Sequence, residues 1–186
     1  MIRPERLSLH VLELPLVHPF RTSFGEERVR RALLVTLETD GVAGWGECVA
    51  SSGPWYSYET VDTAWWAIRE AFVPLIKGKA FSHPRELPQV LARVRGHPMA
   101  KAALEGALWD LYGRIEGKPL AALLGGVRDE VPAGVSIGIQ TEVSALLDRI
   151  AGFVDQGYRR VKLKVKPGWD LEVLEAVRAR FPDLTL

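Results

Sequence analysis

The sequence predicts an α+β domain over residues 1–128, followed over residues 129–186 by the first strands and helices of a parallel β/α sheet or barrel. Three observations lead to this expectation. Apolar residues alternate through the first 50 residues, as in strands. They recur at spacings of three and four over residues 58–124, as in helices. After Gly126, strand-like and helix-like segments alternate with short connections, which indicates parallel strands with helices outside.

The composition is that of a folded globular protein with little net charge. Of its 186 residues, 47% are hydrophobic and 25% are charged, and the formal net charge is +1. A packed core is therefore expected, and binding to nucleic acid or to a membrane surface is not. The single cysteine, Cys48, excludes an internal disulfide and fits a reducing compartment. Neither a signal peptide nor a membrane span of roughly 18 apolar residues is present, so we expect a cytoplasmic protein.

The first part begins with predicted strands. Residues 6–14 are extended, and we expect Pro15 and Pro19 to break this strand. Residues 31–49 form a hairpin around the turn T-D-G, because glycine tolerates the positive φ that such turns need. The stretches H-P-F-R-T-S-F-G and S-S-G-P-W-Y-S-Y-E-T, on either side of the hairpin, are predicted to be surface loops.

Helices are predicted in the rest of the first part. Apolar residues recur along residues 58–77, and Gly78 ends that helix. A shorter helix follows Pro84. The strongest helix covers residues 99–115 and ends at Gly117, and small residues on its apolar stripe permit close packing against a neighbour. The stripe consists of Ala100, Ala103, Leu104, Ala107, Leu108, Leu111 and Ile115.

In the second part, strands and helices alternate. Strands are predicted at residues 131–139, 161–166 and 184–186. A helix capped by Thr141 runs to about residue 156, and a second helix capped by Asp170 runs to about residue 180. This order is typical of a β/α unit whose strands are parallel.

Three lysines alternate with apolar residues from Val161 to Lys166, so their ammonium groups share one face of the strand. Small residues such as Ser136 occupy the corresponding face of the preceding strand. Because parallel strands have both faces shielded from bulk water, we expect the lysines to face an enclosed pocket. A solvated or edge strand is the alternative. The lysines are Lys162, Lys164 and Lys166.

Such a row of cations favours one kind of chemistry. Neighbouring ammonium groups disfavour one another's charge, which can leave one amine free to accept a proton. The amines that stay charged can hold a carboxylate. The pattern therefore indicates removal of a proton α to a carboxylate, which needs further positive charge, typically a divalent metal ion.

The motifs together resemble the N-terminal half of an enolase-superfamily protein of the muconate-lactonizing subgroup. Within it, they are most similar to the N-acylamino acid racemase and o-succinylbenzoate synthase branch. The resemblance implies an α+β capping domain followed by a modified α/β TIM barrel. The motifs are P-L-V-H-P-F-R-T-S-F-G, G-W-G-E-C, G-P-W-Y-S-Y-E, M-A-K-A-A-L-E-G-A-L-W-D, L-L-G-G-V-R-D, V-S-I-G-I and V-K-L-K-V-K-P-G-W-D.

The resemblance also implies roles for five residues. Lys164 would be an acid/base on one face of the substrate α-carbon, and Lys162 its electrostatic partner near the carboxylate. Phe20 and Tyr56 would close over the substrate from the capping domain. Ser136 would contact the acyl or succinyl end.

Family members bind Mg²⁺ through acidic residues on the third, fourth and fifth barrel strands, and a second catalytic lysine lies on the sixth. The chain ends at Leu186, where the third strand begins, so we expect the ligands for Mg²⁺ (or Mn²⁺ or Co²⁺) to lie outside it. We therefore expect a truncated barrel that is inactive alone. The resemblance gives no role to Lys166, which we expect to be a solvated residue at the mouth of the barrel.

The expected partner is a small-molecule carboxylate, and we expect a homo-oligomer. Two candidate reactions are favoured: racemisation of N-acylamino acids, and dehydration to o-succinylbenzoate for menaquinone synthesis. Dipeptide epimerisation and muconate cycloisomerisation are alternatives within the superfamily. A non-catalytic binding or assembly module is an alternative of a different class.

Overall fold

The structure, a computed structural model, describes residues 1–22 and 25–186. Ser23 and Phe24, which belong to the predicted loop H-P-F-R-T-S-F-G, lie outside the described residues. Within the described ranges, no helix combines the length and the apolar character that crossing a bilayer requires.

The chain divides into two compact units. Met1–Pro15 and Val29–Val127 form the first, and Leu16–Arg28 and Arg128–Leu186 form the second. The break after Val127 falls where the sequence pattern changes. The sequence did not indicate that a segment as early as Leu16–Arg28 joins the second unit.

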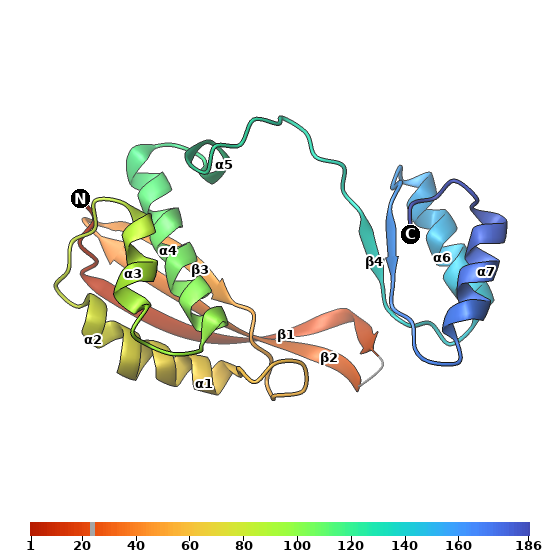
Figure 1. The fold of residues 1–186 in the computed structure, drawn as a ribbon, viewed down its shortest axis with the longest axis horizontal. Helices are drawn as coiled ribbons and strands as arrows, with labels where there is room; N and C mark the ends of the chain where they lie inside the picture. The colour runs from red at the N-terminus through yellow and green to blue at the C-terminus, as the bar shows by residue number, and fades with distance from the viewer. Residues whose placement is uncertain (23–24) are drawn as a thin grey trace. The chain divides into compact units, whose positions relative to one another are not determined.

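The first unit is built on a three-stranded sheet in the order β1-β2-β3 (Figure 1). The strands are β1 (Arg6–Thr22), β2 (Gly25–Thr39) and β3 (Val42–Cys48). β2 and β3 pair antiparallel and are joined by Asp40 and Gly41, whose φ angles of 48° and 75° fit a type I′ turn. The hairpin predicted from T-D-G is therefore confirmed.

The predicted break in the first strand is wrong. β1 continues through Pro15 and Pro19 to Thr22, so the described part of H-P-F-R-T-S-F-G belongs to strands and not to a loop. The reason is the position of β1 at the edge of the sheet. Two prolines four residues apart direct their nitrogens to the same side of a strand, and on an outer edge the missing N–H groups cost no ladder hydrogen bond.

One continuous helical run follows, consisting of α1 (Val61–Trp66), a π-helical turn η1 (Ala67–Phe72) and α2 (Val73–Ile76). The N–H of Val73 donates to the carbonyl of Ile68, five residues back. Pro74 explains this widened turn, because its ring crowds the carbonyl four residues earlier and it has no N–H to donate. The sequence predicted the run and its end before Gly78, but not the π turn.

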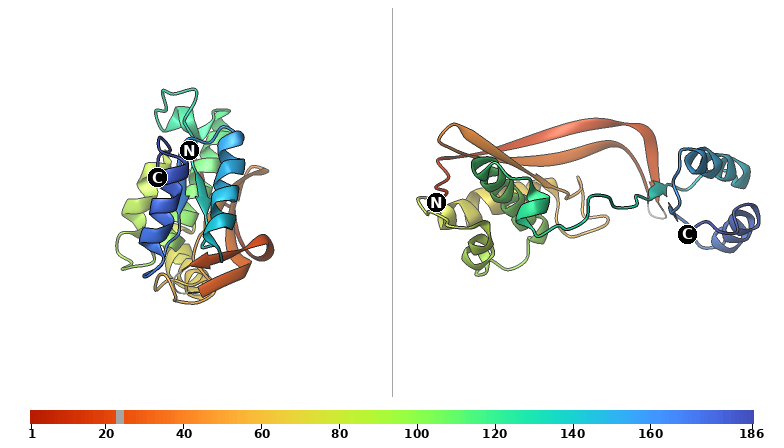
Figure 2. Two further views of the ribbon diagram at one scale, coloured as in Figure 1. Left: turned by 90° about the vertical axis from the view of Figure 1, so that its right-hand side faces the viewer. Right: turned by 90° about the horizontal axis from the view of Figure 1, so that it is seen from above.

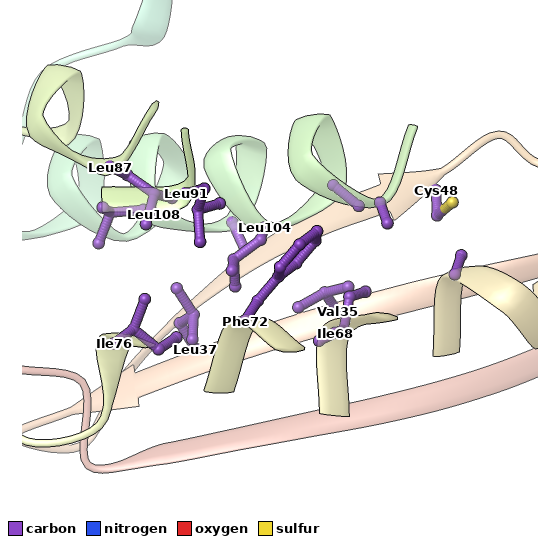
Figure 3. Packing of buried hydrophobic residues seen from close by; sticks show 14 of the residues in the cluster. Val35, Leu37, Cys48, Ile68, Phe72, Ile76, Leu87, Leu91, Leu104 and Leu108 are labelled. Carbon is purple, nitrogen blue, oxygen red and sulfur yellow. The ribbon is translucent and has the colours of Figure 1, made fainter. Parts of the chain in front are cut away.

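Four further helices complete the first unit: η2 (Pro84–Glu86, 3₁₀), α3 (Leu87–Leu91), α4 (Pro98–Glu116) and α5 (Leu120–Leu123). The helices α1 to α4 cover one face of the sheet (Figure 2). The core between the layers includes Val35, Leu37, Ile68, Phe72 and Leu104 (Figure 3). The predicted stripe of α4 is buried from Ala100 to Leu111, but Ile115, at the far end of the helix, is 46% exposed.

The amino end of α4 is capped by a distant carboxylate. Glu59 is only 1% exposed and accepts hydrogen bonds from the N–H groups of Met99 and Ala100, at 2.7 and 3.1 Å. A carboxylate at this end is favoured by the unpaired N–H groups and by the helix dipole. Glu59 thereby fixes the loop before α1 to the start of α4.

In the second unit, two parallel strands carry two helices on one side (Figure 1). They are β4 (Val135–Ile137), α6 (Val143–Asp155), β5 (Val161–Leu163) and α7 (Asp170–Arg180). A parallel bridge between Arg160 and Thr185 starts a third strand beside β5. The predicted β-α-β-α-β order with parallel strands is confirmed. The core consists of Ile137, Leu146, Ile150, Val161, Val173 and Val177.

Several predicted boundaries in this unit are wrong. Both strands are three residues long and thus shorter than predicted. The residues that cap α6 and α7 are Glu142 and Trp169, one position from the predicted Thr141 and Asp170, and neither cap makes a side-chain hydrogen bond. Asp170 is instead in the first turn of α7, where its charge still suits the helix dipole.

Candidate active site

The pairing of β4 with β5 brings two predicted site residues side by side. Ser136 lies directly opposite Lys162, flanked by the pairs Val135–Val161 and Ile137–Leu163. Since strand side chains alternate, the apolar residues face the helices and Ser136 and Lys162 share the opposite face. The prediction of one apolar and one polar face is confirmed for these positions.

The predicted row of three strand lysines is only partly correct. β5 ends at Leu163, although the N–H of Lys164 still donates to the carbonyl of Ile137 at 3.0 Å. Val165 is 38% exposed and does not join the core. Lys166 begins a turn, because Pro167 has no N–H to extend the ladder and Gly168 takes a positive φ of 79°.

The polar face is open in the described part of the chain, which holds only the first strands of the predicted barrel, so the enclosed pocket stays a prediction. Lys162, Lys166 and Ser136 are exposed, and Lys164 is half-buried. The interior of a β/α barrel is enclosed by eight strands. Here two strands and one further bridge lie side by side, so most of this face meets solvent.

Lys164 is partly covered by an aromatic ring from the tip of the β1–β2 hairpin. Its Nζ lies 5.7 Å from the centre of the Phe20 ring, within the range of a cation–π interaction. The hairpin tip passes close to Gly138. A Cβ on this residue would lie 3.4 Å from the carbonyl oxygen of Arg21, which is an ordinary contact distance.

Charged side chains brace the same hairpin tip. Glu26 forms ion pairs with Arg21 and with Arg28. The hydrogen bond from Arg21, together with the positive charges of Arg21 and Arg28, lowers the pKa of the Glu26 carboxyl below its ordinary value. The two ion pairs link residues on both strand ends of the hairpin tip that carries Phe20.

The structure thus brings together four of the five predicted site residues in two pairs, Phe20 with Lys164 and Ser136 with Lys162. The fifth, Tyr56, belongs to the first unit, where its side chain is 78% exposed. The expectation that Tyr56 lies in a surface loop between β3 and α1 agrees with this placement.

The sequence did not single out Gly138 or the Arg21–Glu26–Arg28 group. The alternation of side chains gave a usable signal for Gly138, because Gly138 lies two residues after Ser136 and so belongs to the same face of small residues. The ion pairs depend on how the hairpin folds back on itself, and their spacing in sequence gives no comparable signal.

A metal site is not formed by the described residues. Within residues 1–22 and 25–186, no three His, Cys, Asp or Glu side chains lie close enough to hold a metal ion. The cationic face around Lys162 and Lys164 is also a poor ligand set for Mg²⁺, which prefers oxygen donors. No metal-dependent step can therefore be derived from this part of the chain.

The first two thirds of the chain match a known family. Residues 7–125 match the family model of the mandelate racemase/muconate lactonizing enzyme N-terminal domain. The chain belongs to this family. The capping domain of the enolase superfamily, predicted from the sequence, is thereby confirmed.

Relatives with established names are similar along the whole chain. The o-succinylbenzoate synthase of Geobacillus kaustophilus is 51% identical over 186 residues, which is 100% of this chain and 50% of the relative. The N-succinylamino acid racemase of Thermus thermophilus is 47% identical over 185 residues, again 100% of this chain and 50% of the relative. The chain therefore spans about half the length of the curated relatives it matches.

Solved structures agree with this relationship. A member of the enolase superfamily from Listeria innocua superposes with a TM-score of 0.91 at 38% identity, over 97% of this chain and 49% of that one. The chain thus has the fold of a capping domain followed by the first strands and helices of the superfamily's barrel.

Proposed function

We propose that this chain forms the N-terminal half of an enzyme that removes the α-proton of a carboxylate substrate. The reaction is racemisation of an N-acylamino acid, dehydration to o-succinylbenzoate, or both at one site. The observation that carries the proposal is the group formed by Lys162, Lys164, Ser136 and Phe20 at the carboxyl ends of parallel strands. Catalytic residues of β/α barrels lie at this end of the strands.

In the proposed reaction, the Lys164 amine takes the proton from the α-carbon. The C–H bond breaks, its electron pair passes into the carboxylate as an enediolate, and the proton moves to Nζ. Lys162 lies on the polar face of β5, and its ammonium stabilises the charge that develops on the carboxylate. Return of a proton to the opposite face of the carbon gives racemisation.

The remaining predicted residues are assigned to binding. Phe20 and Tyr56 close over the substrate, and Ser136 contacts its acyl or succinyl end. The proximity of the Phe20 ring to Lys164 supports a role for Phe20 in excluding water from the amine. For Tyr56, the support is its exposed aromatic side chain in a loop rich in glycine, serine and proline.

We also expect the whole enzyme to need a divalent metal ion, bound by residues outside this chain. In support, a dipeptide epimerase from Enterococcus faecalis, solved as a complex with Mg and the dipeptide L-Leu-L-Tyr, superposes with a TM-score of 0.85 at 25% identity. Dipeptide epimerisation and muconate cycloisomerisation are less favoured. The structures named for these activities are 24–26% identical to this chain, against 51% and 47% for the two curated relatives.

The test is exchange of the substrate α-proton in deuterated water, measured by NMR on the whole enzyme with Mg²⁺. We expect N-acylmethionine to exchange and the Lys164→Gln variant to exchange roughly 10³-fold more slowly. Lys79→Gln, which removes an exposed lysine of the first unit, is the matched control and should leave the rate unchanged.

Four outcomes would contradict the proposal. Exchange of a dipeptide alone would assign epimerisation, and an undiminished rate in Lys164→Gln would remove the proposed base. Absence of exchange from every substrate would favour a non-catalytic binding module. Exchange by residues 1–186 alone would show that the catalytic centre needs nothing further.

A further inference from the structure

An open cavity of about 550 Å³ lies within the second unit, beyond the carboxyl ends of β4 and β5. The hairpin tip contributes Arg21 and Glu26 to its lining. The segments that follow the two strands contribute Gln140, Thr141, Lys166 and Trp169. Ligands of parallel α/β folds bind at this edge of the strands, so the cavity is placed where a substrate can reach it.

The charges around this cavity do not cancel. Glu26 is already paired with both Arg21 and Arg28, so one carboxylate meets two guanidinium groups. Lys166 also lines the cavity. Within residues 1–22 and 25–186 it forms no ion pair, not even with the nearby Asp170. Two cations, Arg21 and Lys166, thus line the cavity with one carboxylate, Glu26, whose charge Arg28 also offsets from outside the lining, and the cavity suits an anion.

The backbone holds Lys166 in place. Trp169 donates its N–H to the carbonyl of Lys166 at 3.1 Å, which closes a four-residue turn. Pro167 and Gly168, with a φ of 79°, are the residues that a type II turn favours at its two central positions. The base of the Lys166 side chain is thus fixed, and the long stem leaves the ammonium free to reach into the cavity.

We propose that this cavity binds a carboxylate at the far end of the substrate, and that Lys166 is a specificity-determining residue. The inference rests on the proposed function, in which the α-carbon lies beside Lys164. Lys166 follows Lys164 by two positions in the chain, so their Cα atoms lie at most about 7 Å apart. That is the reach of a four-carbon diacid arm or of an acidic amino-acid side chain, and the Thr141 hydroxyl can add a hydrogen bond.

The test compares three substrates of the whole enzyme that differ in the position of a second carboxylate. N-acetylmethionine has none, N-succinylmethionine has one on the acyl arm, and N-acetylglutamate has one on the side chain. We expect the kcat/KM of α-proton exchange for one of the two diacids, relative to N-acetylmethionine, to fall about tenfold in Lys166→Gln. The diacid affected identifies which arm occupies the cavity.

Lys79→Gln removes an equivalent charge from the first unit and should leave all three ratios as in the wild type. Unchanged ratios in Lys166→Gln, with exchange still measurable, would overturn the inference and leave the proposed function intact. Circular dichroism of each variant checks that it is folded.

A binding measurement separates the two proposals further. Glutarate serves as the probe in calorimetric titrations, because it carries two carboxylates but lacks the N-acylated α-carbon at which the proposed reaction takes place. We expect wild type to bind glutarate about tenfold more tightly than Lys166→Gln, whether or not any substrate exchanges. Equal affinities would overturn the anion site, and absence of exchange with unequal affinities would overturn only the proposed reaction.

Discussion

At the hairpin tip, one carboxylate pairs with two arginines. Glu26 accepts a hydrogen bond from Arg21 and lies 2.6 Å from a terminal nitrogen of Arg28. These residues follow Phe20 closely in the chain, so the ion pairs fix the strand ends from which the aromatic ring reaches Lys164. A pair of this kind is sensitive to acid because protonation of the carboxyl removes the attraction.

The pKa of Glu26 is predicted to lie below that of an ordinary glutamate, because its charged form is stabilised by Arg21 first and by Arg28 second. The stabilisation is complete above the unfolded-state pKa and is lost as the pH falls through the folded-state pKa. NMR titration of the Glu26 carboxyl carbon checks this. Arg21→Gln should raise the midpoint towards the ordinary value, and Arg28→Gln should raise it less. A wild-type midpoint at or above the ordinary value would contradict the prediction.

Among the elements, the contact of β3 with α4 is the closest. A Cβ on Gly44 or Gly46 would lie 2.3 or 2.0 Å from backbone atoms of α4. The helix side of the contact is equally small, with Ala103 and Ala107 fully or almost fully buried. Glycines in the strand and alanines in the helix therefore allow the two backbones to meet, which fixes the helix layer on the sheet.

Replacing Gly46 by alanine should destabilise the protein by roughly 3 kcal/mol, because the new methyl group overlaps the carbonyl of Ala103 and forces α4 away from the sheet. The matched control is Gly106→Ala on the same interface. A Cβ there would lie 3.8 Å from Gly46, an ordinary contact, and alanine should favour the helix by up to about 1 kcal/mol. Denaturant titration measures both changes. Equal stabilities of the two variants would contradict this account of the contact.

Over the whole molecule, the two units are not consecutive in sequence. The second unit takes Leu16–Arg28 from the middle of the β1–β2 hairpin and Arg128–Leu186 from the end of the chain. The 99 residues Val29–Val127 separate these segments, so the two segments must come together across this long stretch before the second unit can be complete. The hairpin tip is thus part of the structure that supports the candidate site.

Replacing Leu16–Arg28 by the two-residue turn Asn-Gly should leave the first unit folded and weaken the second. Amide hydrogen exchange measures the outcome. We expect the amides of Val35 and Leu37 to keep their protection, because their core lies entirely in the first unit. Protection of Ile150 in α6 should fall by roughly tenfold or more, since small units with few buried contacts open readily. The division into two units would be contradicted if amide protection fell equally in both units, or if it fell in neither.

The candidate site shows how far sequence reasoning extends. Alternation along β4 and β5 correctly placed Ser136 and Lys162 on one face, because a strand's side-chain period is local. The same reasoning wrongly extended β5 to Lys166, where Pro167 and Gly168 turn the chain. It also gave no sign that Phe20 lies over Lys164, since that contact joins residues far apart in sequence.

Local sequence patterns were sufficient to predict the order of strands and helices, the turn at Asp40–Gly41 and the apolar stripe of α4. These depend on periodicity and turn chemistry within a few residues. Three features were found only in the folded chain: β1 continues through its two prolines, Glu59 caps α4, and the hairpin tip joins the second unit. Each of these depends on an edge position or on a partner distant in sequence, and local patterns carry no information about either.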